Sequence, residues 1–204
     1  AASIDSPYIV FCGVYFMAET AAILCAPNQV VLQPVYEARC PMAEMANRDQ
    51  AQQAWEALSQ VWSDPIVPIT YQNSNADVKA FVGEHGGAVC TSSNARRIFE
   101  WALGQGARIL FLPDEHLGTN TALDMGLPES ELGIWNPRHT PDPRTLRDCR
   151  VVVWKGFCSV HTGFEVEDVL RARRTYPGAR VIVHPECPHP VVVAADAAGS
   201  TSYI

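Results

Sequence analysis

The sequence has no apolar run near the roughly 20 residues that a membrane-spanning helix needs, so we expect no membrane span. It is also poor in basic residues, since 15 Lys and Arg stand against 22 Asp and Glu, for a formal net charge of -7. Because neutralising phosphates requires clustered Lys and Arg, a nucleic acid is not expected as a partner. The two basic clusters, at residues 96–97 and 171–174, lie in helix-like stretches and read as solvent-exposed faces.

Nucleotide-binding loops are missing as well, since the chain has neither a GxGxxG nor a Walker motif. Its seven cysteines include no CxxC pair, and their odd number does not suit the disulfide framework of a small secreted domain. Residues 1–5 have neither the basic region nor the apolar core of a signal peptide. We therefore expect a cytoplasmic protein whose thiols are free or bind a metal.

A composition of 48% hydrophobic and 18% charged residues is typical of a globular protein. Seven short apolar or β-branched runs predict buried strands, at residues 9–14, 30–35, 66–71, 88–91, 108–112, 150–155 and 180–184. Most are continuously apolar, which is typical of a parallel sheet covered on both faces. Helical spacing of apolar residues predicts helices over residues 50–62, 76–84, 95–105 and 166–176. Alternating strands and helices predict an α/β fold with right-handed crossovers.

Two breaks divide the chain. Residues 62–65 mark the first, and residues 137–147, with Pro141 and Pro143, read as a linker or a long loop. We therefore expect three pieces, covering residues 1–62, 63–147 and 148–204.

Polar and reactive residues follow nearly every predicted strand, at residues 71–73, 91–94, 114–116, 158–161, 184–186 and 199–202. In open α/β sheets the ligand crevice lies outside the carboxyl ends of the strands, so we expect a cleft for a small polyanionic substrate there. Ser-Asn-Ala occurs at two predicted helix starts, residues 74–76 and 93–95. Each is read either as a plain N-cap or as an anion site at a helix N-terminus.

Cys40 and Cys158 stand in loops after strands, where an active-site loop would lie. Cys158 and His161 form a single CxxH pair, which is a weak zinc signal by itself, and loop cysteines far apart in sequence can also meet at one iron–sulfur cluster. The remaining cysteines have apolar neighbours or lie inside elements, so we interpret them as small buried hydrophobes. They are Cys12, Cys25, Cys90, Cys149 and Cys187.

His184 and Glu186 end a predicted strand and suit either acid/base chemistry or a loop that satisfies them with backbone groups. His116 suits either a base or a structural turn histidine, and we favour the structural reading because Leu117-Gly118 resembles a tight turn before a helix-like stretch. Tyr71, at a strand end beside Asn73, is either a core aromatic or a residue that faces the cleft.

Taken together, these motifs resemble the quinolinate synthase family, the A protein of bacterial NAD biosynthesis. The matching stretches are residues 16–21, 71–80, 91–95, 113–118, 154–161, 183–186 and 199–202. Single motifs are weak, but the ordered set along nearly the whole chain is specific. The resemblance implies three similar three-layer αβα domains with short parallel sheets around a pseudo-threefold axis. Residues 1–62 would then end the first domain and add a connecting helix, residues 63–147 would form the second, and residues 148–204 an incomplete third.

The resemblance also implies a transferase with a central [4Fe–4S] cluster, for which Cys40 and Cys158 are the first two ligands. Three thiolates would leave one iron open as a Lewis acid. The implied reaction condenses iminosuccinate with dihydroxyacetone phosphate to quinolinate, releasing phosphate and water, with a functional link to the enzyme that supplies iminosuccinate. The implied substrate-binding residues are Tyr71, Gln72, Asn73, Ser92, His184, Pro185, Glu186 and Thr201. Tyr71, His184 and Glu186 form the expected catalytic set, with proton transfer on Tyr71 and Glu186.

The family's third cluster cysteine and its first-domain His-Tyr-Tyr stretch have no counterpart in this sequence. Without an initiator Met, and with residues 199–204 stopping inside an element, we expect a segment of a longer protein that is inactive alone. Two other functions stay open: a cofactor-free α/β enzyme for a small phosphorylated or dicarboxylate substrate, and a non-catalytic carboxylate-binding protein. The first would use His184 and Glu186 as acid and base.

Overall fold

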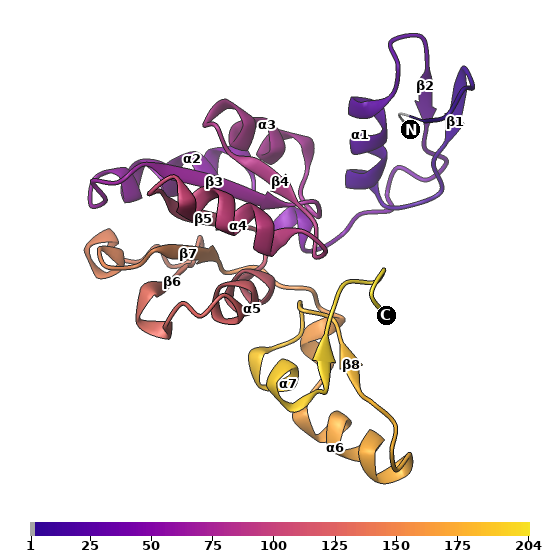
Figure 1. Ribbon diagram of the computed structural model, residues 1–204. Helices are drawn as coiled ribbons and strands as arrows, with labels where there is room; N and C mark the ends of the chain where they lie inside the picture. Colours follow the sequence, from indigo (N-terminus) through magenta and orange to yellow (C-terminus); the bar gives the residue numbers. More distant parts are fainter. Residues whose placement is uncertain (1–2) are drawn as a thin grey trace.

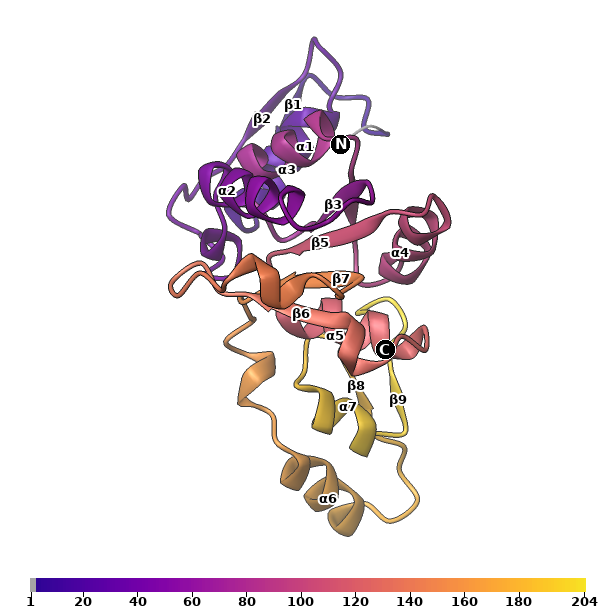
Figure 2. The same ribbon diagram turned by 90° about the vertical axis from the view of Figure 1, so that its left-hand side faces the viewer.

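The computed structural model describes residues 3–204. They form a central unit with a smaller lobe at either end, the first lobe carrying the N-terminus and the third lobe carrying the C-terminus (Figures 1 and 2). None of the helices within residues 3–204 has the length and apolarity that crossing a bilayer takes.

Five parallel strands build the sheet of the central unit, in the order β4-β3-β5-β7-β6. Their bounds are β3 Ile66–Tyr71, β4 Ala88–Cys90, β5 Arg108–Leu112, β6 Leu132–Trp135 and β7 Val151–Trp154. Because all five run the same way, their carboxyl ends meet at one edge of the sheet, and the loops that follow them lie together there.

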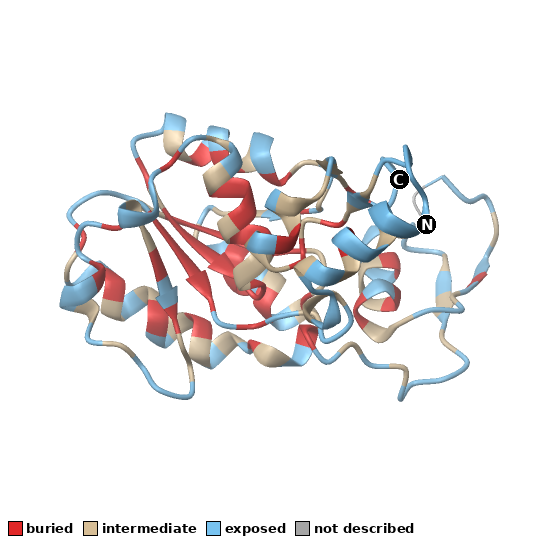
Figure 3. Cartoon of the chain, turned by 90° about the horizontal axis from the view of Figure 1, so that it is seen from below, coloured by how far each residue is buried: buried red, intermediate tan, exposed pale blue. Residues whose placement is uncertain are grey.

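Helices cover both faces of this sheet. They are α2 Arg48–Ser59, α3 Ala76–Glu84, α4 Ala95–Gly104 and α5 Glu115–Asp124. Successive strand residues point to opposite faces, so Ile109 and Phe111 pack with α4 and α5, while Leu110 and Leu112 pack with α2 and α3. Buried residues gather in this sheet and its helices (Figure 3). The α/β fold with a parallel sheet and three layers is confirmed.

The first lobe is a parallel pair of short strands with one helix. β1 Tyr8–Val10 pairs with β2 Val30–Leu32, and α1 Tyr15–Leu24 lies between them in the chain. The strands expected over residues 9–14 and 30–35 are therefore shorter, and α1 was not predicted. Its sequence is apolar nearly all round, so it shows no helical stripe that would separate it from a strand.

The third lobe holds α6 Val166–Thr175, α7 His189–Ala194 and two very short parallel strands, β8 Ile182–Val183 and β9 Ala197–Ala198. Its small core of Val169, Cys187 and Val191 is separate from the two core clusters of the central unit.

The boundary expected between residues 147 and 148 falls inside the central sheet, because β7 pairs with β5 on one side and with β6 on the other. Residues 137–147 are not a linker between domains but the connection from β6 to β7. They contain the 3₁₀ helix Pro143–Leu146, and the Leu146 carbonyl accepts a 2.9 Å hydrogen bond from the buried Trp62 indole. Since α2 also packs on this sheet, we propose that the central unit runs from residue 41 to residue 156.

Two side chains of α1 hold the first lobe against the central unit. Glu19 Oε2 accepts a 3.0 Å hydrogen bond from the Ala76 backbone N–H, which caps α3 in place of the Asn75 side chain. The Thr20 hydroxyl accepts hydrogen bonds from Lys79 Nζ (2.8 Å) and Gln72 Nε2 (2.9 Å). The loop that follows β3 is therefore tied to the first lobe.

Candidate active site

The loops after β3, β4, β5 and β7 meet the turn after β8, which the third lobe presents to the same edge of the sheet (Figure 1). Ser92 follows β4, and its Oγ lies 3.2 Å from Nε2 of His184, which follows β8. Tyr71 ends β3, and its hydroxyl lies close enough to Glu186 for the two to perturb each other's pKa. Tyr71, Ser92, His184 and Glu186 thus share one site between the central unit and the third lobe.

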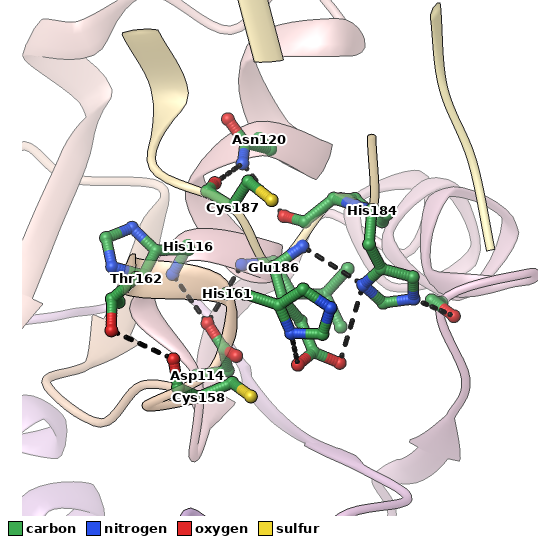
Figure 4. Close-up of polar contacts among 12 residues, drawn as sticks. Asp114, His116, Asn120, Cys158, His161, Thr162, His184, Glu186 and Cys187 are labelled. Atoms are coloured by element: carbon green, nitrogen blue, oxygen red, sulfur yellow. Dashed lines mark hydrogen bonds and ion pairs between the residues drawn. The ribbon is translucent and has the colours of Figure 1, made fainter. Parts of the chain in front are cut away.

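Glu186 is the centre of this site (Figure 4). Its side chain is only 4% exposed, and its Oε2 lies 2.9 Å from Nδ1 of His161, while Oε1 lies 3.7 Å from Nδ1 of His184. Burial by itself would raise the pKa of Glu186, but the contacts with His161 and Tyr71 outweigh it and lower the pKa. Glu186 is therefore an ionised carboxylate although it is buried.

The pKa values of the two histidines beside Glu186 shift in opposite directions. The carboxylate raises the pKa of His161, whereas burial lowers the pKa of His184. The rings stack with centroids 4.8 Å apart, an arrangement that favours only one of them carrying charge. The Glu186 backbone N–H donates to His184 Nδ1 (3.3 Å), so the neutral His184 ring carries its proton on Nε2, toward Ser92.

The contact between His161 and Glu186 is an ion pair rather than an aligned hydrogen bond. Although 2.9 Å separates Nδ1 from Oε2, the carboxylate lies off the direction of the ring N–H, and this buried nitrogen has no hydrogen-bond partner among the described residues.

Tyr71 is buried at the end of β3, where its ring belongs to a core cluster of the central unit, so it is not exposed to a cleft in this structure. Burial and the negative charge of Glu186 raise the pKa of Tyr71. At neutral pH its hydroxyl is therefore protonated and can donate a hydrogen bond or a proton.

Asp114 is a site residue that sequence reasoning noted only as part of a motif. It is fully buried, and its Oδ1 caps α5 by accepting from the His116 and Leu117 backbone N–H groups (2.7 and 3.0 Å). His116 therefore lies in the first turn of this helix rather than in a tight turn. Asp114 Oδ2 has no partner in the described part of the chain, and burial together with the charge of Glu186 raises the pKa of Asp114 to about 8.

Asn120 was missed by sequence reasoning because it sits inside α5, one turn from the nearest motif. Its amide donates to the carbonyls of Pro185 (2.8 Å) and Cys187 (2.9 Å), and its Oδ1 lies 2.7 Å from His189 Nδ1. Asn120 thus fixes the turn that carries His184 and Glu186, and Pro185 takes part through its backbone (Figure 4).

Two cavities flank the contact between His184 and Ser92. One, of about 350 Å³, is lined by His161 and His184 and by apolar side chains of the third lobe. The other, of about 310 Å³, is lined by Ser92, Asn120 and Pro185 among others. Each is large enough for a small anionic molecule.

A sequence model of the family described as Quinolinate synthetase A protein matches residues 1–204. The chain belongs to this family. It is 51% identical over 208 residues to the quinolinate synthase of Lysinibacillus sphaericus, and the alignment covers 100% of this chain and 56% of that protein. It is 52% identical over 204 residues to the quinolinate synthase of Corynebacterium glutamicum (98% of this chain, 52% of that protein). The chain thus spans about half the length of the curated relatives it matches.

Three other expected substrate residues, Gln72, Asn73 and Thr201, make no hydrogen bond to Glu186 within residues 3–204. Gln72 points its amide at Thr20 of the first lobe. Asn73 is half-buried after β3, and Thr201 is exposed in the final turn of the chain. Their assignment as substrate-binding residues stays a prediction.

The cysteines expected to bind metal in this family, Cys40 and Cys158, are both half-buried free thiols that pack against the same core cluster. Met45 links their loops, because its carbonyl accepts from the Trp154 indole (2.8 Å) and its Sδ from the Phe157 N–H (3.3 Å). Of the cysteines interpreted as buried hydrophobes, three are buried (Cys90, Cys149 and Cys187), Cys25 is half-buried and Cys12 is exposed, which corrects that interpretation for Cys12.

One group of side chains combines three types of metal ligand. The Cys158 sulfur, a ring nitrogen of His161 and a carboxylate oxygen of Glu186 all lie within 4.8 Å of one another. The CxxH pair is therefore completed by a residue of the third lobe.

Proposed function

We propose that the protein to which this chain belongs is a quinolinate synthase that condenses iminosuccinate with dihydroxyacetone phosphate to quinolinate, releasing phosphate and water. The observation that carries the proposal is the convergence of Tyr71, Ser92, His184 and Glu186 at one edge of the parallel sheet. The family membership of the whole chain supports the same activity. With seven free cysteines, the protein suits a reducing cytoplasm, where it would receive iminosuccinate from the enzyme that makes it.

We propose that Ser92 and His184 bind an anionic group of the substrate. The neutral His184 ring carries its proton on Nε2, and the Ser92 hydroxyl can turn from it to a ligand. His184 therefore offers a hydrogen-bond donor to one cavity and Ser92 offers one to the other. Asn73 and Thr201 would add donors once a ligand is bound.

We propose that proton transfer depends on Glu186 and Tyr71. Glu186 is ionised and can accept a proton, while the protonated Tyr71 can donate one to a leaving oxygen. His161, whose pKa is raised by its contact with Glu186, can return the proton. Removing water from two substrates needs both an acid and a base, and these groups lie side by side.

We propose that Cys40 and Cys158 hold a [4Fe–4S] cluster together with a cysteine outside this chain. The two thiols fit such a group, because they are free and half-buried and pack against the same buried hydrophobic residues. Contacts of Met45 also link the loops that carry them. Burial raises the pKa of Cys158, so a bound metal is what would keep this sulfur a thiolate. When bound, the cluster supplies a Lewis-acidic iron.

The test is quinolinate formation by the full-length protein after anaerobic reconstitution with iron and sulfide. Tyr71→Phe keeps the ring and removes only the hydroxyl, so we expect it to lower kcat far more than it raises KM. Ser92→Ala should mainly raise KM, because it should weaken substrate binding by about 1–3 kcal/mol. Cys40→Ser and Cys158→Ser should abolish bound iron, while Cys25→Ser, also half-buried, should not.

Turnover by iron-free protein would overturn the cluster assignment and favour a cofactor-free enzyme. A Tyr71→Phe variant with the parental kcat would move the acid role from Tyr71 to His161. If the full-length protein binds its ligand but does not turn it over, the result favours a non-catalytic carboxylate-binding protein.

A further inference from the structure

The ligand group of Cys158, His161 and Glu186 has features of a binding site for a single metal ion. Cys158 and His161 lie on one loop, and Glu186 comes from the turn after β8 in the third lobe (Figure 4). The three ligand atoms lie within 4.8 Å of one another, so small side-chain rotations would bring them around one ion. The Thr162 hydroxyl donates to the Cys158 carbonyl (3.0 Å) and so holds the loop that carries both ligands.

Two polar atoms here lack the partners that buried groups normally have. His161 Nδ1 is buried without an aligned hydrogen bond, although Glu186 Oε2 is 2.9 Å away. Asp114 Oδ2 is buried without any partner in the described residues. Because buried polar atoms are nearly always satisfied, such atoms around a set of ligands indicate a missing charged group.

We propose that Cys158, His161 and Glu186 bind one divalent transition-metal ion, Zn²⁺ above all, when the protein carries no cluster. Thiolate, imidazole and carboxylate are the three protein ligands of Zn²⁺, and a three-ligand site leaves a fourth position for water or a carboxylate. The negative charge of the ionised Glu186 favours a cation at this point. On binding, the thiol proton of Cys158 passes to solvent and a sulfur–zinc bond forms, with no change of oxidation state.

The ion site stands on these residues alone, but one consequence rests on the proposed function. The Cys158 sulfur is needed both by the iron–sulfur cluster and by the single ion. Zn²⁺ bound there would therefore compete with cluster assembly. Divalent zinc binds nitrogen and sulfur ligands more tightly than ferrous iron does, so the competition favours zinc wherever it is available.

The experiment uses the full-length protein, purified anaerobically and freed of iron. Co²⁺ is added as a coloured substitute for Zn²⁺, and the bound metal is counted while the sulfur-to-cobalt absorption is recorded. We expect one ion per chain with a thiolate band that Zn²⁺ bleaches. Cys158→Ser should remove the band, and His161→Ala and Glu186→Gln should each weaken Zn²⁺ binding at least about tenfold.

Cys40→Ser is the matched control, because it should abolish the cluster yet leave Zn²⁺ binding at the parental affinity. If Cys40→Ser abolishes Zn²⁺ binding while His161→Ala and Glu186→Gln keep it, the ion is held by the cluster cysteines and the proposal is wrong. An absence of Co²⁺ binding would overturn it as well. Neither result depends on quinolinate formation, and circular dichroism of each variant separates lost ligands from lost folding.

Discussion

Replacing Thr20 by valine should loosen the contact between the first lobe and the loop that carries Tyr71. The Thr20 hydroxyl donates to the Phe16 carbonyl (2.9 Å) and accepts from Lys79 Nζ (2.8 Å) and Gln72 Nε2 (2.9 Å). One donor and two acceptor sites are all that a hydroxyl has, so its capacity is fully used. Valine has nearly the same shape and leaves both donors without this partner.

The cost follows from the burial of these donors. A fully buried donor without a partner costs roughly 1–3 kcal/mol, and more if it is charged. Gln72 and Lys79 are both half-buried, so water can replace part of what is lost. Burial already lowers the pKa of Lys79 to about 8, so its ammonium is poorly solvated and depends on the contacts that α1 provides. We therefore expect Thr20→Val to lower the free energy of unfolding by about 1–3 kcal/mol in total.

The assay is urea unfolding of the full-length protein, with Thr20→Ser as the matched control because it keeps the hydroxyl. Since Gln72 is the neighbour of Tyr71, kcat for quinolinate formation should fall in the valine variant more than in the serine variant. Equal urea midpoints for the two variants would refute the idea that this hydroxyl joins the lobes.

Two further changes test the site and its scaffold. Asp114→Asn keeps an N-cap oxygen for α5 but removes the charge. Because the pKa of Asp114 is raised to about 8 in the folded protein, the folded state binds more protons than the unfolded state between about pH 4 and pH 8, and parental stability should fall as pH rises through that window. Urea midpoints of the asparagine variant should lack this slope, and an unchanged slope would show that Asp114 is not its source. In Gly156→Ala, the new Cβ would stand 2.2 Å from the Pro113 carbonyl oxygen, so it must push apart the chain segments that leave β5 and β7. We expect Gly156→Ala to lose about 1–3 kcal/mol of stability in thermal unfolding. Gly163→Ala is the control and should lose much less, because a Cβ there meets no atom within 4 Å. A similar loss in both variants would contradict the steric argument.

The sequence by itself determined the fold class of the central unit. Residues 109–112 form a continuously apolar run, and only a sheet covered on both faces buries every residue of such a run. It also predicted that Tyr71 and Ser92 lie at one edge of this sheet, because polar residues after parallel strands of one sheet lie together there. The order and spacing of the motifs also indicated the family, since both can be seen in the sequence without a structure.

Pairing between distant segments was decided only by the tertiary structure. β7 was assigned to the third domain because prolines precede it, yet its hydrogen-bond partners β5 and β6 place it in the central sheet. α5 was not predicted because its Gly, Thr and Asn residues are poor helix formers, and packing overrides that propensity: Gly118 lets the helix approach Phe111 and Val153 more closely than a Cβ would allow.

The chemistry of the site also depended on the tertiary structure. Spacing shows the pair of Cys158 and His161 but not Glu186 beside them, because the third lobe must dock before these atoms come together. Nor does a sequence reveal that Asp114 is fully buried, with one oxygen lacking a partner within residues 3–204, or that the pKa values of His161 and His184 shift in opposite directions. Desolvation and the distance between charges set a pKa, and both exist only once the chain has folded.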